Sequence, residues 1–336
     1  MPELVNRRWT LANRPVGYPE TRDFAIVEAE VDDPRHGEIL VRTLYLSLDP
    51  YMRGRLRDRR SYAVPVGIGD VIVGEGVGRV IASQSDDVAV GDIVACQIGW
   101  QEYAVVPGHM ARKIDPSIAP ISTALGVIGM PGLTAYHGLL AVGRPKPGET
   151  VLVSAASGAV GAVVGQIAKM NGCRVIGTVG SDQKAEYCTD ELGFDACVNY
   201  KTEDVFARIA ELAPDGIDIY FDNVGGTVTD AAIENLALRG RVIICGQISQ
   251  YNLEEPEMAP RNLWTLITKQ ARIEGFLVFN FEQDHEVARA RLAAWVRDGS
   301  LKYREDIVDG FEEAPRAFIG LMNGANFGKL LVKMSD

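Results

Sequence analysis

The sequence predicts a two-domain α/β protein, in which a doubly wound, six-stranded parallel sheet accompanies a smaller β-barrel domain. The length of 336 residues corresponds to two domains of about 150 residues each. Residues 1–115 contain short alternating apolar runs separated by turns, whereas from residue 150 apolar runs alternate with amphipathic helical stretches. Hydrophobic residues make up 47% and charged residues 24%, which is ordinary for a globular protein and excludes a disordered chain.

The first domain is expected to be rich in β-strands. Alternating runs at Ile39–Leu46, Val71–Val80 and Ile93–Ala95 are separated by turns rich in Gly, Pro and Asp. This spacing indicates a small, closed or partly closed barrel. The tail ends in a strand-like run, Lys329–Lys333, which could pair back onto the first domain.

The second domain is expected over residues 121–299, so that the first spans residues 1–120 and is completed by residues 300–336. Its six expected strands are Thr150–Ser154, Arg174–Val179, Ala196–Asn199, Ile217–Asp222, Arg241–Cys245 and Arg272–Val278. The expected helices are Ala159–Asn171, Gln183–Leu192, Glu203–Leu212, Val228–Leu236, Leu263–Lys269 and Asp284–Asp298. Strands spaced by helices imply a parallel sheet that is covered on both faces.

Charge and cysteine content exclude several functions. The 34 basic and 45 acidic residues give a net charge of −11 without a long basic run, so nucleic acid and anionic membrane surfaces are poor candidate partners. The five scattered cysteines form no C-x-x-C pair, which argues against a disulfide framework and a structural zinc knuckle.

No membrane segment is expected. Two uncharged runs, Pro116–Gly143 and Val151–Ala168, are interrupted by proline or glycine and are better interpreted as buried segments. The N-terminal residues lack the apolar stretch of a signal peptide. We therefore expect a cytoplasmic protein.

The strongest local signal is a glycine-containing turn between an apolar strand and a helix. The segment Val151–Gly161 places Gly158 and Gly161 in a G-x-x-G spacing. Glycine at position 158 lets the backbone approach a pyrophosphate, Gly161 allows close helix–strand contact, and the helix N-terminus supplies N–H groups. A bare G-x-x-G is weak evidence, because many tight turns use it only for packing. Its place at the start of six strands favours a dinucleotide-binding Rossmann loop.

The end of the second strand favours NADP(H) over NAD(H). An NAD site usually has Asp or Glu there to hold the ribose 2′-hydroxyl. Here the stretch Ile176–Ser181 is followed only at Asp182 by an acid. Small residues leave room for a 2′-phosphate that Lys184 could neutralise, although a lysine at a helix start is usually only solvated. We expect NADPH as the cofactor.

Several longer strings run along nearly the whole chain. They are Leu48-Asp-Pro-Tyr-Met-Arg53, Gly129-Met-Pro-Gly-Leu-Thr-Ala-Tyr136, Ala155-Ala-Ser-Gly-Ala-Val-Gly161, Val179-Gly-Ser-Asp-Gln-Lys184, Asn199-Tyr-Lys201, Tyr220-Phe-Asp-Asn-Val-Gly-Gly226, Cys245-Gly-Gln-Ile-Ser-Gln-Tyr-Asn252 and Gly324-Ala-Asn-Phe-Gly-Lys329. The chain thereby resembles the medium-chain dehydrogenase/reductase superfamily, which joins a GroES-like barrel to a Rossmann domain. Within it, the strings resemble the zinc-free, NADPH-dependent alkenal/enone reductases: the leukotriene B4 dehydrogenase, prostaglandin reductase and curcumin reductase group.

The zinc alcohol dehydrogenases of this superfamily differ at two places. They carry a cysteine near the first barrel strands and a Gly-His-Glu motif, where this chain reads Leu46-Ser-Leu-Asp-Pro and Val73-Gly-Glu-Gly-Val. A catalytic zinc needs about three N, S or O ligands. No histidine of the chain has a cysteine or carboxylate at ligand spacing. We predict that the protein holds no metal.

The resemblance implies a set of cofactor contacts. The pyrophosphate would meet Gly158, Ala159 and Val160, and the 2′-phosphate would meet Gly180, Ser181, Lys184 and Tyr200. Asn223 follows the fourth strand, where the sheet changes direction. The remaining contacts would be Met130, Thr134, Cys245, Gly246, Gln247, Ile248, Ser249, Phe276, Leu277, Val278 and Asn326. For Cys245, Phe276 and Val278, core packing is the alternative.

Without a metal, reduction of a carbon–carbon double bond conjugated to a carbonyl remains feasible. Hydride passes to the β-carbon while negative charge builds on the carbonyl oxygen, and one hydrogen-bond donor aimed at that oxygen is worth about 3–4 kcal/mol. A phenol, whose usual pKa is about 10, can donate without ionising at neutral pH. In the enzymes that the chain resembles, one tyrosine hydrogen-bonds the substrate carbonyl, and the shared motifs make Tyr51 and Tyr251 the candidate catalytic donors, although either could merely shape an aromatic wall.

Two other functions stay open: an NADPH:quinone reductase, which would not need the tyrosine pair, and a non-enzymatic NADPH-binding sensor. The resemblance implies a small-molecule α,β-unsaturated carbonyl substrate without identifying it. The segment Gln250–Arg261 could be a specificity lid or a solvated connection. The resemblance also implies a homodimer, formed through an edge of the Rossmann sheet that carries apolar residues such as Ile273 and Leu277.

Overall fold

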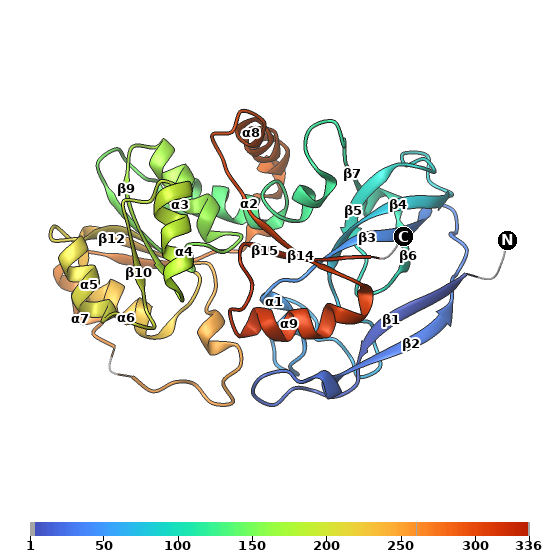
Figure 1. The fold of residues 1–336 in the computed structure, drawn as a ribbon, viewed down its shortest axis with the longest axis horizontal. Coiled ribbons are helices and arrows are strands. Elements are labelled where there is room, and N and C mark those ends of the chain that lie inside the picture. Colours follow the sequence, from blue (N-terminus) through green and yellow to red (C-terminus); the bar gives the residue numbers. More distant parts are fainter. Residues whose placement is uncertain (1–3, 260, 335–336) are drawn as a thin grey trace. The chain divides into compact units, whose positions relative to one another are not determined.

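The structure is a computed structural model that describes residues 4–259 and 261–334. It divides into two compact units (Figure 1). The first comprises the described residues of Met1–Leu125 and Glu305–Asp336, and the second comprises those of Gly126–Arg304. The first unit is therefore assembled from both ends of the chain.

The second unit contains the predicted six-stranded parallel sheet. Its strands are β8 (Thr150–Ser154), β9 (Arg174–Val179), β10 (Ala196–Asn199), β11 (Ile217–Asp222), β12 (Leu236–Ile244) and β13 (Arg272–Gly275). Their order across the sheet is β10-β9-β8-β11-β12-β13, and all neighbours are parallel. This is the strand order of a doubly wound dinucleotide-binding sheet, so the predicted fold class is confirmed.

Helices cover both faces of this sheet. They are α2 (Met130–His137), the π-helical turn η4 (Gly138–Gly143), α3 (Gly161–Met170), α4 (Asp182–Glu186), the π-helical turn η5 (Tyr187–Glu191), α5 (Val205–Leu212), α6 (Gly226–Glu234), α7 (Trp264–Thr268) and α8 (His285–Arg297). Short 3₁₀ turns follow β12 and β13, at η6 (Ile248–Gln250) and η7 (Val278–Asp284).

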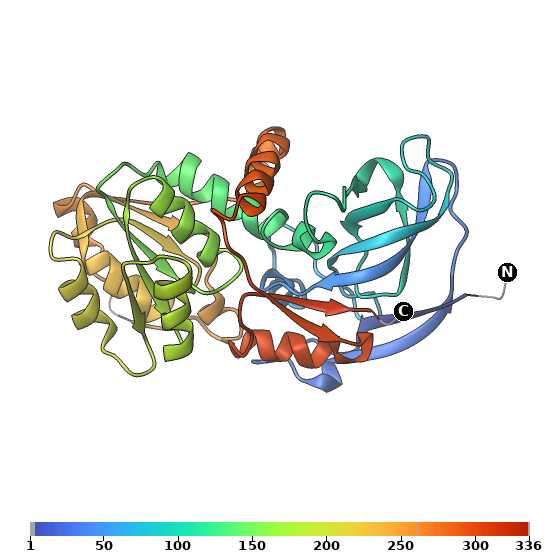
Figure 2. The same cartoon turned by 45° about the horizontal axis from the view of Figure 1, so that its top comes forward.

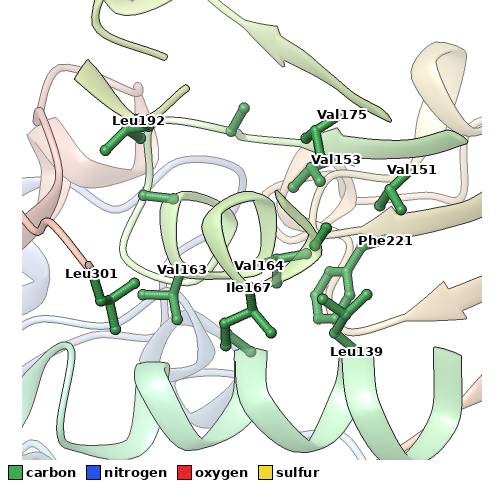
Figure 3. Packing of buried hydrophobic residues seen from close by; sticks show 14 of the residues in the cluster. Leu139, Val151, Val153, Val163, Val164, Ile167, Val175, Leu192, Phe221 and Leu301 are labelled. Atoms are coloured by element: carbon green, nitrogen blue, oxygen red, sulfur yellow. The ribbon is translucent and has the colours of Figure 1, made fainter. Parts of the chain in front are cut away.

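Alternate strand residues face opposite sides of the sheet, as the period of a strand requires. Val151 and Val153 of β8 pack with α3 on one face, whereas Leu152 between them packs with α5 and α6 on the other. Val163 and Ile167 of α3 belong to the same apolar cluster as Leu139 and the strand residues labelled in Figure 3. Two apolar layers therefore cover the two faces of the sheet. The loops at its edge remain available for a binding site.

The largest errors in the predicted strand boundaries of this sheet lie in β12 and β13. Strand β12 begins at Leu236 rather than Arg241, because Leu236 is buried and pairs with Ile217 on β11. Strand β13 ends at Gly275 rather than Val278, because its neighbour β12 ends at Ile244 and offers no further backbone partner. The segment after Gly275 therefore leaves the sheet edge.

The first unit contains a seven-stranded sheet and a separate pair of strands. The pair is β1 (Val5–Leu11) with β2 (Phe24–Glu30), and the sheet contains β3 (Glu38–Ser47), β4 (Glu75–Ser83), β5 (Ile93–Gln97), β6 (Tyr103–Pro107), β7 (Arg112–Lys113), β14 (Glu305–Asp309) and β15 (Lys329–Lys333). Its helical segments are α1 (Tyr51–Arg55), α9 (Ala314–Met322) and the 3₁₀ turns η1 (Thr21–Asp23), η2 (Gly108–Met110), η3 (Ile121–Leu125) and η8 (Phe311–Glu313).

The tail returns to the first unit as predicted. Strand β15 pairs antiparallel with β3, with Leu331 opposite Ser47, and β14 lies beside it in parallel (Figure 2). The sequence did not predict β14 or α9. The predicted strand from Val71 begins only at Glu75, since Val71 makes no more than an isolated bridge with Thr10.

Across residues 4–259 and 261–334, no helix combines the length and the apolar character that a membrane span requires.

Candidate active site

The predicted cofactor residues of the second unit lie in loops that follow the strands. Parallel strands bring their carboxyl ends to one edge of the sheet, and ligands bind there where the strand order reverses. In this sheet the order reverses between β8 and β11, which are neighbours. The loops after β8, β9, β10, β11 and β12 contain the predicted residues 158–160, 180–181, 200, 223 and 245–249. One edge of the sheet therefore collects most of the candidate site.

The turn after β8 is tightly wound. The backbone N–H of Gly158 donates to the carbonyl of Ala155 (2.9 Å), and Ala155 itself has a positive φ of 50°. A Cβ on Gly161 would lie 2.3 Å from the Ala155 carbonyl oxygen, so only glycine fits there. Helix α3 then begins at Gly161, and its N-cap residue Val160 supplies no capping side chain. This arrangement suits a backbone cradle for phosphate oxygens.

Four predicted 2′-phosphate residues are brought together after β9 and β10. The Ser181 hydroxyl caps α4 by accepting the backbone N–H of Lys184 (3.3 Å). The backbone N–H of Tyr200 donates to the Val179 carbonyl (3.0 Å), and a Cβ on Gly180 would lie 2.8 Å from the Tyr200 hydroxyl oxygen. The absence of a side chain at Gly180 therefore leaves room for the Tyr200 phenol beside the backbone.

Lys201 belongs to the same cluster and was not assigned from the sequence. A Cβ on Gly180 would lie 3.3 Å from its Cε atom, and its backbone N–H donates to Asn199 Oδ1 (3.2 Å). The string Asn199-Tyr-Lys201 held the available signal, but a lysine beside a strand end is usually only solvated. The cluster thus carries two lysines, Lys184 and Lys201.

Asn223 is fixed by the strand at the switch point. Its side-chain Nδ2 donates to the Ser154 carbonyl (2.7 Å), and its backbone N–H donates to the Ser154 hydroxyl (2.8 Å). Both residues stand at the carboxyl ends of adjacent strands. The predicted contact residue is therefore held in one orientation by two hydrogen bonds.

Asp222, which the sequence analysis did not single out, organises the turn after β11. This fully buried carboxylate accepts the backbone N–H groups of Val224 (2.9 Å) and Gly225 (2.8 Å) and the hydroxyls of Tyr220 (2.8 Å) and Thr229 (2.7 Å). Gly225 and its neighbour have positive φ angles of 78° and 61°. A buried carboxylate needs such a full set of donors.

The segment Cys245–Tyr251 folds back against the same turn. The backbone N–H groups of Cys245 and Gly246 donate to the Asp222 carbonyl (2.9 and 3.0 Å), and the Ser249 hydroxyl donates to the Val224 carbonyl (2.7 Å). Burial raises the pKa of the Cys245 thiol to about 12, so the thiol stays neutral. The predicted residues 245–249 and Asn223 are thus neighbours.

The phenol of Tyr251 lies against this segment. Its oxygen accepts the backbone N–H of Gln247 (3.3 Å), and a Cβ on Gly246 would approach it to 3.1 Å. An oxygen that accepts a hydrogen bond becomes a better donor through its own proton. Tyr251 therefore lies beside the predicted cofactor residues 245–249.

Phe276 and Val278 pack in the apolar core, which bears out the alternative for both. The Phe276 ring centroid lies 6.3 Å from that of Phe221, and Val278 is buried with the same cluster. Leu277 is exposed by 36%. On α2, the buried Thr134 hydroxyl donates to the Met130 carbonyl (2.7 Å). Whether these residues also contact a cofactor stays a prediction.

Tyr51 and Asn326 are the predicted site residues of the first unit. Tyr51 begins α1, and its burial, helped by the charges of Asp49 and Glu75, raises the pKa of its phenol above the usual range. The phenol therefore stays protonated and can donate. Asn326 Nδ2 donates to the Gly328 carbonyl (2.8 Å), which fixes the turn before β15.

Arg53 connects α1 to the segment before β2. This fully buried guanidinium donates from Nη2 to the carbonyls of Gly17 (2.6 Å) and Pro15 (3.3 Å). Burial, with Arg57 nearby, lowers the pKa of Arg53 to about 10. The helix that carries Tyr51 is thereby tied to the N-terminal segment.

Two family models match the chain. One, described as the N-terminal domain of oxidoreductase, matches residues 7–114, and the other, described as zinc-binding dehydrogenase, matches residues 159–294. Within the described part of the chain, no three His, Cys, Asp or Glu side chains gather where they could hold a metal ion. Fold and models together define an oxidoreductase of the medium-chain dehydrogenase/reductase class.

Full-length relatives narrow this class. The chain is 45% identical to the NADPH-dependent curcumin reductase of Escherichia coli, over 98% of this chain and 97% of that one. It is 44% identical to the NADP(+)-dependent 2-alkenal reductase of Nicotiana tabacum, over 99% and 98% of the two chains. The chain belongs to the family of zinc-free, NADPH-dependent alkenal and enone reductases.

Solved structures agree with this assignment. The crystal structure of CurA from Vibrio vulnificus in complex with NADPH has a TM-score of 0.94 and 45% sequence identity, and covers 98% of this chain and 99% of its own. A quinone oxidoreductase from Pseudomonas syringae has a TM-score of 0.79 and 26% identity, covering 98% and 99%. The likeness to the first is therefore substantially closer than the likeness to the second.

Proposed function

We propose that this protein uses NADPH to reduce the carbon–carbon double bond of α,β-unsaturated aldehydes and ketones. The observation that carries the proposal is the 45% and 44% identity to a curcumin reductase and a 2-alkenal reductase over nearly the entire chain. The natural substrate is a small molecule in which a carbonyl is conjugated to the double bond. Nucleic acid and membranes have no part in this reaction.

The cofactor site fits NADPH. The turn at residues 155–161 leaves a side-chain-free backbone for the pyrophosphate, since a Cβ on Gly161 would clash with Ala155. Lys184, Lys201, Ser181 and Tyr200 provide cations and hydroxyls for a 2′-phosphate, which carries close to two negative charges. The relative of known structure is in complex with NADPH.

The catalytic contribution of the chain is hydrogen bonding to the carbonyl oxygen. Bound NADPH supplies the hydride that becomes attached to the β-carbon, and a solvent-derived proton completes the α-carbon. A tyrosine phenol, that of Tyr51 or that of Tyr251, donates a hydrogen bond to the carbonyl oxygen, where negative charge builds. The raised pKa of Tyr51 keeps its proton on the phenol at neutral pH. The chain itself needs no metal for this step.

We assign the two tasks to the two domains. Residues 121–299 bind the cofactor, and residues 1–120, completed by 300–336, carry Tyr51 and Asn326. Residues 1–3 and 335–336 lie outside the described residues. The segment Gln250–Arg261, in which Pro260 also lies outside them, adjoins Tyr251 and is either a lid over the substrate or a solvated connection.

We also propose a cytoplasmic homodimer. The edge strand β13 exposes Ile273 by 40%, and Trp264, Ile267 and Phe279 near it in sequence are exposed by 67%, 67% and 63%. An unpaired strand edge beside such apolar side chains is suited to pairing with a second copy. All five cysteines are free thiols, as a reducing compartment would leave them.

The proposal is tested by offering a simple enone, its saturated ketone and a quinone side by side, with NADPH and, in parallel, with NADH. Nicotinamide absorbance reports oxidation, and the products are identified. We expect NADPH oxidation with the enone and recovery of the saturated ketone. Turnover of the quinone alone would assign a quinone reductase instead. Binding of NADPH without any turnover would favour a sensor.

A further inference from the structure

In the first unit, a buried ion pair joins the segment before α1 to the strand β15. Lys329 Nζ donates to Asp49 Oδ1 (2.6 Å), to Ser47 Oγ (2.7 Å) and to the Leu48 carbonyl (3.1 Å). Lys329 and Asp49 expose only 4% and 5% of their surfaces. The Ser47 hydroxyl donates in turn to the other oxygen of Asp49. We call Lys329, Asp49 and Ser47 the Lys329 clamp.

Stability alone does not explain the Lys329 clamp. Burying two charges costs several kcal/mol per ion, and well-packed apolar residues of similar size are often as stable or more so. A hydrogen-bonded ion pair instead fixes the relative orientation of the segments that carry its two charged groups. Each of the three ammonium protons has an acceptor, and both carboxylate oxygens accept. The clamp therefore defines one geometry for the segment it holds.

That segment carries the predicted catalytic phenol. Asp49 stands two residues before Tyr51, and its carbonyl accepts the backbone N–H of Met52 (3.1 Å) in the first turn of α1. On the other side, Lys329 stands three residues after Asn326, whose side chain bonds the Gly328 carbonyl. The Leu48 backbone N–H also donates to the Leu330 carbonyl (3.2 Å). Both predicted site segments of the first unit thus meet at the clamp.

Lys329 is directed at this segment rather than at its neighbour in the sheet. Glu305 is its register partner on β14. One oxygen of Glu305 accepts the Ser122 hydroxyl (2.8 Å), and the other is buried without a hydrogen bond among the described residues. An ammonium that served only to join β14 to β15 would bond this adjacent carboxylate. Its three bonds go instead to residues 47–49.

We propose that Lys329 is a positioning residue for catalysis, which acts through Asp49 and Ser47 to hold the Tyr51 phenol in its working place. The inference rests on the proposed function, in which Tyr51 donates a hydrogen bond to the substrate carbonyl. In this proposal the strand β15 contributes to catalysis through Lys329, in addition to pairing with β3 and β14.

Turnover of an enone with NADPH tests this in a double-mutant cycle. Lys329→Met should lower kcat about tenfold or more when Tyr51 is present and less than about twofold in a Tyr51→Phe background, because a positioning residue has nothing left to position. The Kd for NADPH should stay unchanged. Equal losses of kcat in the two backgrounds would overturn the proposal, since a general structural role acts regardless of the phenol.

Two further measurements keep the proposal falsifiable. If Lys329→Met fails to fold, Asp49→Asn/Lys329→Met removes both charges and enters the same cycle, since no unpaired charge is then buried. Amide hydrogen exchange of residues 48–56 should accelerate in the folded variant, whereas Lys333→Met, an exposed lysine on the same strand, should change nothing. Unchanged exchange would overturn the proposal even if the protein turned over no enone, so the two failures are distinguishable.

Discussion

Tyr251 and Tyr51 are held in different ways. The Tyr251 oxygen accepts a backbone N–H from Gln247 (3.3 Å). Tyr51 instead begins a short helix, and Asp49, two residues before it, is bonded to Lys329. A hydrogen bond into the phenol oxygen strengthens its own donation, and a fixed helix start limits its movement. Each side chain is thus prepared as a donor by its own surroundings.

Tyr251→Phe should lower kcat with an enone about tenfold or more and leave the Kd for NADPH unchanged, because one aimed donor is worth about 3–4 kcal/mol when lost completely. Steady-state kinetics and cofactor titration measure the two effects. Tyr18→Phe, at an exposed tyrosine, is the matched control and should change neither. An unaltered kcat would remove Tyr251 from the mechanism.

Lys184→Ala should weaken NADPH binding about tenfold to a hundredfold and NADH binding hardly at all, because a charge-assisted hydrogen bond to phosphate contributes about 1.5–3 kcal/mol. Lys201→Ala should show the same selectivity to a smaller extent. Calorimetric titration with both dinucleotides measures it, and Lys146→Ala, at an exposed lysine, is the control. Equal losses for NADPH and NADH would show that Lys184 does not recognise the phosphate.

The sequence predicts some of these residues better than others. Gly158, Gly161 and Lys184 could be named as candidates because the turn and the strand end require particular residue types at fixed spacing. Asp222 and Lys329 were missed, because a lone acid at a strand end and a lone lysine in a tail carry no local pattern. The closest donors to the Asp222 carboxylate lie between residues 220 and 229, whereas the partners of Lys329 are brought to it only by the fold, from as far as 280 residues away.

Among the secondary-structure elements, the start of β8 and the middle of β12 are joined by an ion pair. Arg241 Nη1 donates to Glu149 Oε1 (3.0 Å), and Arg241 Nε donates to the Gly143 carbonyl (2.9 Å). Burial acts to raise the pKa of Glu149, but the bonds from Arg241 and from the Lys146 backbone N–H outweigh it and hold this pKa below its usual range. The pair fixes η4 against the sheet.

Glu149→Gln should lower the free energy of unfolding by about 1–2 kcal/mol at neutral pH, because the charged hydrogen bonds are lost. A carboxyl with a lowered folded-state pKa contributes stability above its unfolded pKa and loses it as pH falls through the folded value. The difference between wild type and variant should therefore shrink below about pH 4.5 in chemical denaturation. Glu191→Gln, which alters an exposed pair with Lys302, is the control.

Element positions followed from the sequence more closely than element ends. The first four strands of the parallel sheet lie where the apolar runs predicted them, since burial on both faces leaves a continuous signal. The ends of β12 and β13 were misjudged because pairing with a neighbour, which no local pattern reveals, sets where a strand begins and ends. Strand β14, with its mixed Glu-Asp-Ile-Val-Asp sequence, owes its place to β15.

At the scale of the whole molecule, the exposed edge of the second unit predicts assembly. Ile273→Arg should place a charge on the open edge of β13 and convert a dimer into a monomer of about 36.5 kDa, as measured by sedimentation. Val16→Arg, at a residue that is 75% exposed in the first unit, should leave the mass unchanged. A wild-type protein that sediments as a monomer would contradict the proposed homodimer.

The division of the first unit between the two ends of the chain sets an order of events during synthesis. Residues 126–304, with the whole parallel sheet, leave the ribosome before β14 and β15 exist. Domains generally fold as units while the chain emerges. The sheet can therefore form early, while the segment with Tyr51 must wait for Lys329 on β15. A chain stopped short of β15 would contain every residue of the parallel sheet. It would lack Lys329, the partner of Asp49 in the segment that carries the Tyr51 phenol.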